Sequence, residues 1–180
     1  MPQTNDNVRF VAGVFLLATG FTVPVRAADN GCQPVFDAMT KVLATPTRLY
    51  VTGGAAVGKN KPQNSEMIYA GGAIYLKLGE KWTRSTMTAA AMLKQEEENR
   101  RTAKYSCRYL REETVNGETA AVYANHSETE DIKSDATVWI SKSRGLPLRT
   151  EGDYDTGDPA KTHASIRYDY SNVRPPTGVQ

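Results

Sequence analysis

Residues that most enzyme sites depend on are scarce in this sequence. It has two histidines and two cysteines among 180 residues, and it contains no G-x-S-x-G, H-E-x-x-H or glycine-rich phosphate-binding motif. On a continuous strand, His126 would share a face with Glu128 and Glu130, which is a conceivable metal-binding trio but is more typical of a solvated strand end. We therefore expect no enzyme, no metal and no cofactor.

The sequence also lacks a strong excess of either positive or negative charge. Lysine and arginine total 22 and aspartate and glutamate total 20, which gives a formal net charge of +2 with the bases spread among the acids. Domains that bind nucleic acids usually carry a clustered basic surface. We therefore expect no nucleic-acid partner.

Long apolar runs are confined to the N-terminus, at residues 10–25. This run follows Arg9, is interrupted by Gly20 and Pro24, and leads to a small-residue site that ends at Ala27. The pattern is typical of a secretory signal peptide, and cleavage is predicted after Ala27. The alternative, a membrane anchor, needs about 20 apolar residues without interruption. We expect export, a periplasmic mature protein and only transient contact with membranes.

The two cysteines, Cys32 and Cys107, form an even pair in a chain expected to be exported. This context predicts a disulfide rather than two free thiols. The bridge would join the first predicted helix to a strand that starts near Cys107. Attachment of a lipid to Cys32 is the alternative, but Asp29-Asn30-Gly31 stands where a lipoprotein signal has small and apolar residues.

Two segments have the composition of helices. The first opens at Gln33-Pro34, where proline is tolerated in the first turn, and ends at Pro46. The second, residues 86–104, is rich in strong helix formers, with Thr88 as a plausible N-cap. We expect this second helix to lie on a sheet with its charged side in water.

Alternating apolar and polar residues predict short strands separated by turns, of which Gly71-Gly72, Asn116-Gly117 and Ser143-Arg144-Gly145 give the sharpest signals. We expect an α+β fold, in which two helices cover a curled antiparallel sheet of about eight to ten strands. The predicted organisation is a signal peptide at residues 1–27, a single domain at 28–174 and a flexible tail at 175–180. The expected strands are residues 47–53, 66–71, 73–78, 81–85, 105–114, 119–127, the two arms of 136–155, and 164–173.

The hairpin at residues 138–149, VWISKSRGLPLR, resembles the VWIDKxTGLPL motif of the LolA/LolB-like superfamily. Residues 76–82 and the order of elements along most of the chain carry the rest of the similarity. The superfamily includes the periplasmic carrier and the outer-membrane receptor of lipoprotein sorting, the lipid-binding domain of RseB, and mycobacterial LppX-type lipid carriers. The resemblance implies an incomplete barrel that encloses a hydrophobic cavity for acyl chains, with helices as a lid.

A groove for an acyl chain needs apolar side chains on the inner face of the sheet and a mobile apolar stripe opposite them. The alternative for each candidate is an ordinary place in the core. Arg144, Arg149 and Arg167 could in addition meet an anionic head group. The candidate groove residues are Met67, Tyr69, Ile74, Leu76, Leu78, Met92, Leu93, Tyr109, Val122, Val138 and Ile140.

Together these features predict a non-enzymatic periplasmic binding protein for a lipid, an acyl chain or another amphiphile, with lipid or lipoprotein transport as one use. The alternative from a different class is an interaction or sensor module, in which the sheet edge or the charged helix at residues 92–104 binds another envelope protein. An inner face filled entirely by its own side chains would exclude the first prediction.

Overall fold

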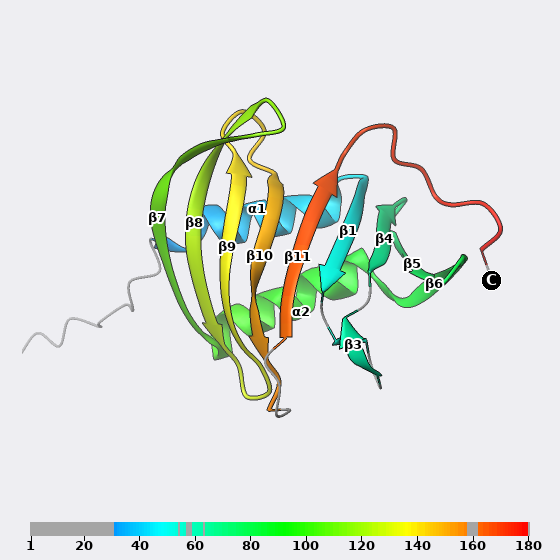
Figure 1. The fold of residues 1–180 in the computed structure, drawn as a ribbon, viewed down its shortest axis with the longest axis horizontal. Coiled ribbons are helices and arrows are strands. Elements are labelled where there is room, and N and C mark those ends of the chain that lie inside the picture. Colours follow the sequence, from blue (N-terminus) through cyan, green and yellow to red (C-terminus); the bar gives the residue numbers. More distant parts are fainter. Residues whose placement is uncertain (1–30, 54, 57–58, 63, 158–161, 180) are drawn as a thin grey trace, which may run out of the picture.

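The fold comes from a computed structural model, which describes residues 31–179 apart from 54, 57–58, 63 and 158–161 (Figure 1). The predicted signal peptide, residues 1–27, lies outside the described residues. Within them, neither helix is long and apolar enough to cross a membrane.

The two helices begin where the sequence predicts. α1 (Gln33–Ala44) has Pro34 in its first turn. α2 (Ala89–Thr102) is capped by Thr88, whose Oγ1 accepts a 3.2 Å hydrogen bond from the backbone N–H of Ala91. This bond satisfies one of the free N–H groups at the helix start. The buried residues of α1 are Val35, Phe36, Ala38 and Val42.

Among the described residues, nine strands form one antiparallel sheet in the order β6-β5-β4-β1-β11-β10-β9-β8-β7. The sheet is open, with β6 and β7 at its edges, so the expected α+β fold with a curled, incompletely closed sheet is confirmed. The strands are β1 (Thr47–Gly53), β4 (Ser65–Ala70), β5 (Ala73–Leu78), β6 (Lys81–Thr88), β7 (Lys104–Val115), β8 (Glu118–Glu128), β9 (Lys133–Ser141), β10 (Pro147–Asp155) and β11 (Thr162–Asp169).

The long-range pairing that joins the two halves of the sheet was not predicted. β11, which follows all the other strands along the chain, pairs with β1 in the middle of the sheet, with Tyr168 opposite Leu49. β11 ends at Asp169, four residues before the predicted end. Part of the expected loop at residues 53–64 forms a separate pair of short strands, β2 (Ala55–Ala56) and β3 (Lys59–Pro62).

The hairpin between β7 and β8 turns through Asn116 and Gly117, which have φ angles of 51° and 82°. Two successive positive φ values are the geometry that favours Asn-Gly in a two-residue hairpin turn. The prediction of a tight hairpin at this position is therefore confirmed.

The predicted disulfide is present between Cys32 and Cys107, with a Cα–Cα distance of 4.8 Å. It fastens the start of α1 to the edge strand β7. The chain passes β7 so closely that a Cβ atom on Gly31 would lie 2.7 Å from the carbonyl oxygen of Cys107. A larger residue at position 31 would force this junction apart.

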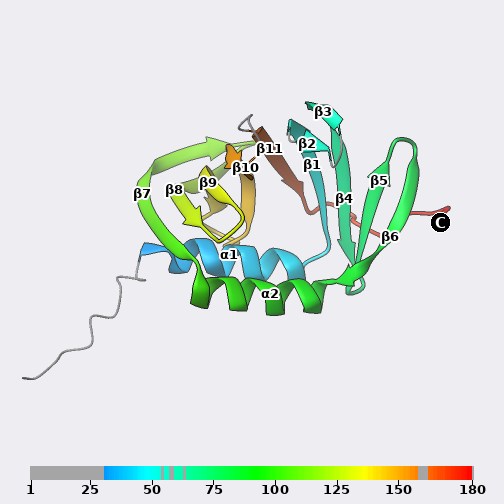
Figure 2. The same cartoon turned by 90° about the horizontal axis from the view of Figure 1, so that it is seen from below.

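Both helices lie on the same side of the sheet, and α1 is the nearer of the two (Figure 2). α1 contacts β9 and β10, whereas α2 packs mainly on α1 and on the end of β6. The expectation that the second helix lies on the sheet therefore needs correction. Its apolar stripe is too short and narrow to cover strands, so it forms an outer layer that reaches the core through Met92.

Because successive strand residues point to opposite faces, the sheet has a helix-covered face and an outer face. In the part of the chain that the structure describes, the helix-covered face carries two apolar clusters and the outer face carries one. The α1 cluster consists of Val35, Ala38, Val138 and Ile140, with Met39, Cys107 and Tyr123 packed against it. The seam cluster consists of Val42, Leu49, Tyr69, Ile74 and Tyr168, with Leu43, Met67, Leu76, Met92, Ile166 and Tyr170 packed against it. The outer cluster consists of Ala120, Val122, Trp139 and Leu148, with Leu110 and Val115 packed against it.

Candidate functional site

The seam cluster brings together residues from both halves of the predicted groove. Met67 and Tyr69 come from β4, Ile74 and Leu76 from β5, and Met92 from α2. Tyr69 and Ile74 are buried, whereas the other three are only half-buried. The apolar contact between the sheet and α2 is therefore buried at Tyr69 and Ile74 and half-exposed at Met67, Leu76 and Met92.

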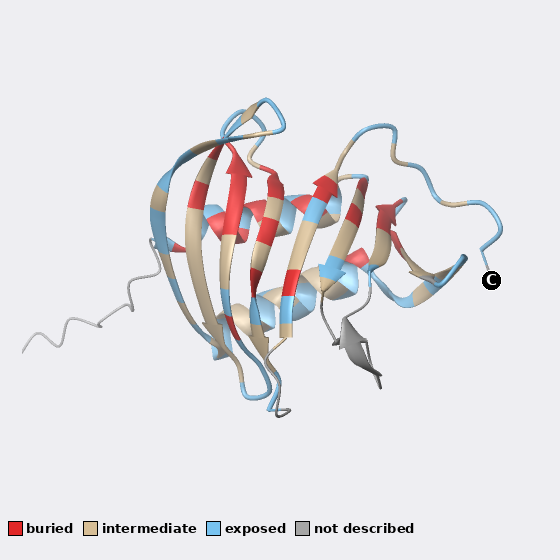
Figure 3. Cartoon of the chain, in the orientation of Figure 1, coloured by how far each residue is buried: buried red, intermediate tan, exposed pale blue. Residues whose placement is uncertain are grey.

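α2 is held loosely over this cluster. Ala89 is the one buried residue among its fourteen, all of which the structure describes, and Met92 and Leu93 are half-buried. The contrast with α1 is visible in Figure 3, where α1 carries several buried positions and α2 is mostly exposed or intermediate. An element with few buried apolar contacts opens at a low free-energy cost.

Arg100 provides the main polar attachment of α2. Its guanidinium donates hydrogen bonds to the carbonyl oxygen of Phe36 at 2.9 Å and to Oγ1 of Thr40 at 2.8 Å, both on α1. The guanidinium also lies 4.6 Å from the centre of the Phe36 ring. Its Nε atom is buried without a hydrogen-bond partner and is 3.6 Å from Oε1 of Glu96. A single side chain thus clasps one helix to the other.

The helix-covered face near β9 and β10 is filled by α1. Val138 and Ile140, which sequence places in the groove, are in contact with Val35 and Ala38 of α1. All four are almost completely buried. This half of the helix-covered face is therefore packed core.

The remaining groove candidates lie elsewhere. Val122 is fully buried in the outer cluster, on the other face of the sheet from Val138. Tyr109 is 51% exposed and makes an edge-to-face contact with Tyr123, with ring centres 5.7 Å apart. Leu93 is half-buried on α2. Leu78 lies at the end of β5, and its side chain is outside the described part of the chain.

The predicted groove lacked six residues of the seam cluster, namely Val42, Leu43, Leu49, Ile166, Tyr168 and Tyr170. The alternation of Ile166 and Tyr168 was visible, but the pairing of β11 with β1 that brings them under the helices was not. Burial raises the pKa of Tyr168, whose hydroxyl lies 3.3 Å from Oγ1 of Thr150. The Tyr168 and Thr150 hydroxyls are therefore a buried polar pair among the apolar side chains of the seam cluster.

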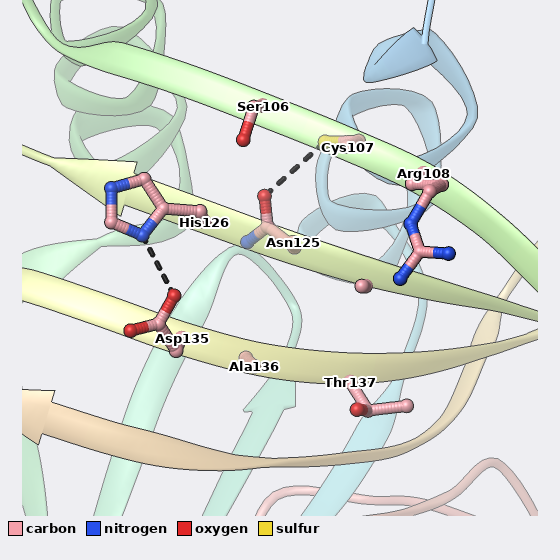
Figure 4. Close-up of a pocket in the computed structure, with 9 residues that line it drawn as sticks. Ser106, Cys107, Arg108, Asn125, His126, Asp135, Ala136 and Thr137 are labelled. Carbon is pink, nitrogen blue, oxygen red and sulfur yellow. Dashed lines mark hydrogen bonds and ion pairs between the residues drawn. The ribbon is translucent and has the colours of Figure 1, made fainter.

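A second feature is a polar dish of about 450 Å³ beside β7, β8 and β9 (Figure 4). Nδ1 of His126 lies 2.7 Å from Oδ1 of Asp135. Ser106 is the cross-strand neighbour of His126 on its other side. Among the hydrogen bonds of the described residues, none joins Ser106 to His126, so the contact that activates a serine nucleophile is missing. The dish is lined by Ser106, Cys107, Arg108, Ala124, Asn125, His126, Asp135, Ala136 and Thr137.

The histidine and the cysteine of this dish are both engaged structurally. β8 ends at Glu128, so Glu130 lies beyond the strand rather than on the face of His126. Sγ of Cys107 lies 3.3 Å from Oδ1 of Asn125, but it belongs to the disulfide and has no proton to donate.

No protein-family model matches this sequence, and comparison with curated proteins finds no match. Among solved structures, the lipoprotein LppX of Mycobacterium tuberculosis is similar with a TM-score of 0.45 and 9% identity, over 78% of this chain and 95% of that one. LprF of Mycobacterium bovis is similar with a TM-score of 0.46 and 9% identity, over 82% of this chain and 96% of that one.

Proposed function

We propose that this protein binds an amphiphile, whose acyl chain lies in the seam between α2 and strands β4 and β5. The observation that carries the proposal is the loose seating of α2 over a half-buried apolar rim. Met67 and Leu76 on the sheet and Met92 on the helix are packed around the same cluster, yet none of them is buried. Apolar surface that is left partly open between two elements is available to a ligand.

The chemistry of the rim suits an acyl chain. Each methylene group that leaves water contributes about 0.8 kcal/mol, so even a partly inserted chain can offset the displacement of α2. Methionine side chains adapt to irregular ligands because they are unbranched and polarizable. The Arg100 clasp would keep α2 attached to α1 while Met92 moves aside. Export, which the N-terminal sequence predicts, would place this activity in the envelope.

The proposal is tested by filling the seam. Leu76 and Tyr75 are adjacent on β5 and therefore point to opposite faces of the sheet. Leu76→Trp should reduce the amount of amphiphile that copurifies with the protein, or the binding of a fluorescent fatty acid, because the larger ring occupies the seam. Tyr75→Trp is the matched control and should bind like the parent protein.

Native and denaturing mass spectra of protein purified gently from the periplasm supply the readout. A stoichiometric amphiphile in the parent protein that is lost in Leu76→Trp supports the proposal. A parent protein without any bound amphiphile, and without uptake of the added fatty acid, rejects it. Equal binding by the two tryptophan variants rejects the location.

The second candidate function is an interaction module that uses the outward side of α2. Glu97 and Arg101 form an exposed ion pair on this side, and Glu98 beside them is exposed. Reversing the charge at Glu97 and Glu98 should weaken binding of an envelope partner and leave acyl-chain binding unchanged. Glu96 is kept in this variant because it faces Arg100.

A further inference from the structure

Two arginines lie side by side on the outer face, away from the seam. Arg149 of β10 and Arg167 of β11 are direct cross-strand partners. Their chain neighbours Thr150 and Tyr168 point into the helix-covered core, so both arginines point to the outer face. Like charges directly opposite each other on a sheet are unfavourable, and their placement requires compensation.

Each guanidinium is supported by an aromatic ring from the next strand. Arg167 lies 4.0 Å from the centre of the Tyr50 ring on β1. Arg149 lies 4.9 Å from the centre of the Trp139 ring on β9. The register places Tyr50, Arg167, Arg149 and Trp139 in one continuous row across four strands. Trp139 is 6% exposed within the outer cluster, so this end of the row is fixed by packing.

The acidic side chains near Arg149 and Arg167 already take part in ion pairs or hydrogen bonds. Glu151 forms an ion pair with Arg149 and also lies 3.5 Å from Nε2 of His163. Oδ1 of Asp169 accepts a hydrogen bond from the backbone N–H of Ser171. Across the described residues, Arg167 makes no ion pair and is exposed to solvent. In this row, Glu151 therefore neutralises the charge of Arg149, whereas the guanidinium of Arg167 is exposed and has no acidic partner among the described residues.

We propose that Arg149 and Arg167 form a binding site for a phosphate group. A guanidinium presents its N–H groups as a planar fork that matches the oxygens of phosphate. Arg167 would offer its open fork and Arg149 the N–H groups that Glu151 leaves free, while Tyr50 and Trp139 hold the two side chains in place. Phosphate binding would also neutralise the charge of Arg167, which forms no ion pair among the described residues. The site lies on the opposite face from the seam, so it is independent of the proposed acyl-chain binding.

The test is a titration of the full mature chain with inorganic phosphate at low ionic strength. The NMR signals of the arginine Nε–H groups report the affinity, and sodium chloride at matched ionic strength controls for screening. Arg167→Gln should weaken phosphate binding about tenfold, because it removes a hydrogen-bonded charge from the site. Arg101→Gln on α2 removes the same charge at a distant place and should change the affinity less than about twofold.

Arg167→Lys keeps the charge and covers the case in which the glutamine variant does not fold. It lacks the fork, so its phosphate affinity should lie well below that of the parent. Equal losses in Arg167→Gln and Arg101→Gln would overturn the site, and so would a lysine variant that binds as tightly as the parent.

A second set of binding measurements distinguishes between a lipid head group and a soluble phosphate as the ligand. Sedimentation with vesicles of phosphatidylglycerol is compared with vesicles of phosphatidylcholine and with soluble glycerol phosphate. Binding that depends on Arg167 and is seen with the anionic vesicles assigns the site to lipid head groups. Binding to inorganic and glycerol phosphate alone assigns it to a soluble ligand. No response to any phosphate probe rejects the site.

Discussion

Asp135 on β9 and Asp153 on β10 lie directly opposite each other on the outer face of the sheet. Each carboxylate is bound by a histidine on its far side. Nδ1 of His126 is 2.7 Å from Asp135, and Nδ1 of His163 is 2.8 Å from Asp153. The four residues form a row in which two opposed aspartates are flanked by two histidines.

The first prediction concerns the pH dependence of stability at His163. The hydrogen bond to Asp153 raises the pKa of His163, with a smaller contribution from Glu151. A pKa that is higher in the folded state stabilises the fold below the ordinary histidine pKa of about 6.5, and this contribution is lost as pH rises through the folded value. His163→Gln should therefore lower the melting temperature slightly at pH 5.5 and leave it unchanged at about pH 8.5. A melting temperature that responds equally at both pH values would contradict this reading.

The second prediction concerns Glu118, which closes the turn of the β9–β10 hairpin. Its carboxylate accepts hydrogen bonds from Nε of Arg144 at 3.0 Å and Nη2 at 2.5 Å, and from Oγ of Ser143 at 3.0 Å. The Arg144 guanidinium, with help from Ser141, lowers the pKa of Glu118 from 4.5 to about 2. A lowered pKa stabilises the fold above the ordinary value, and the gain is lost as pH falls towards the folded value.

Glu118→Gln should accordingly lower the free energy of unfolding at pH 7 by about 1 kcal/mol, a figure reduced for solvent screening. Urea unfolding at pH 7 and at pH 3 is the measurement, and the difference from the parent should shrink at the lower pH. Glu80→Gln, on an exposed turn, is the control. An unchanged difference at pH 3 would mean that the carboxylate charge is unimportant.

The third prediction concerns the disulfide. Cys32 and Cys107 are 75 positions apart, so the bridge closes a long loop. In the chain-entropy model, replacing both cysteines by serine should cost about 4 kcal/mol of unfolding free energy. Urea unfolding of the oxidised parent and of the double serine variant measures this cost. Equal stabilities would show that the unfolded chain is not restrained by the bridge.

The fourth prediction concerns the clasp between the helices. Arg100→Met keeps much of the side-chain volume but removes the hydrogen bonds to Phe36 and Thr40. Hydrogen exchange of the α2 amides should become faster, and stability should fall by about 1–3 kcal/mol. Arg101→Met removes an exposed ion pair one residue away and should have little effect on either quantity. Similar exchange in the two variants would show that Arg100 does not hold the helix.

Local features of this fold could be predicted because their causes are local. Asn116-Gly117 and Gly71-Gly72 allow positive φ angles, and both turns are present. Pro34 and Thr88 mark the starts of the two helices for chemical reasons that hold in any protein. The disulfide followed from the even number of cysteines and the expected export.

Features that depend on long-range geometry could not be predicted. The alternating pattern predicts that Tyr109 and Val122 lie on the same face of the sheet. A bulge near Leu110 changes the register, so that Tyr109 pairs with Tyr123 and Arg111 pairs with Val122. One extra residue moves every later side chain of a strand to the other face. Likewise, the stripe around Met92 shows that α2 is amphipathic, but not that α1 would lie between much of it and the sheet.

The position of β11 has a consequence for how the molecule is assembled. The strand that the ribosome makes after all the others described is the middle strand of nine. Until it arrives, β6 to β1 and β10 to β7 are two separate half-sheets, and each exposes an unpaired inner edge. Pairing between distant parts of a chain is slow, so these edges stay open for longer than those of a simple meander. A variant that lacks β11 should therefore form two half-sheets with exposed edges rather than one shortened sheet, and this variant should aggregate.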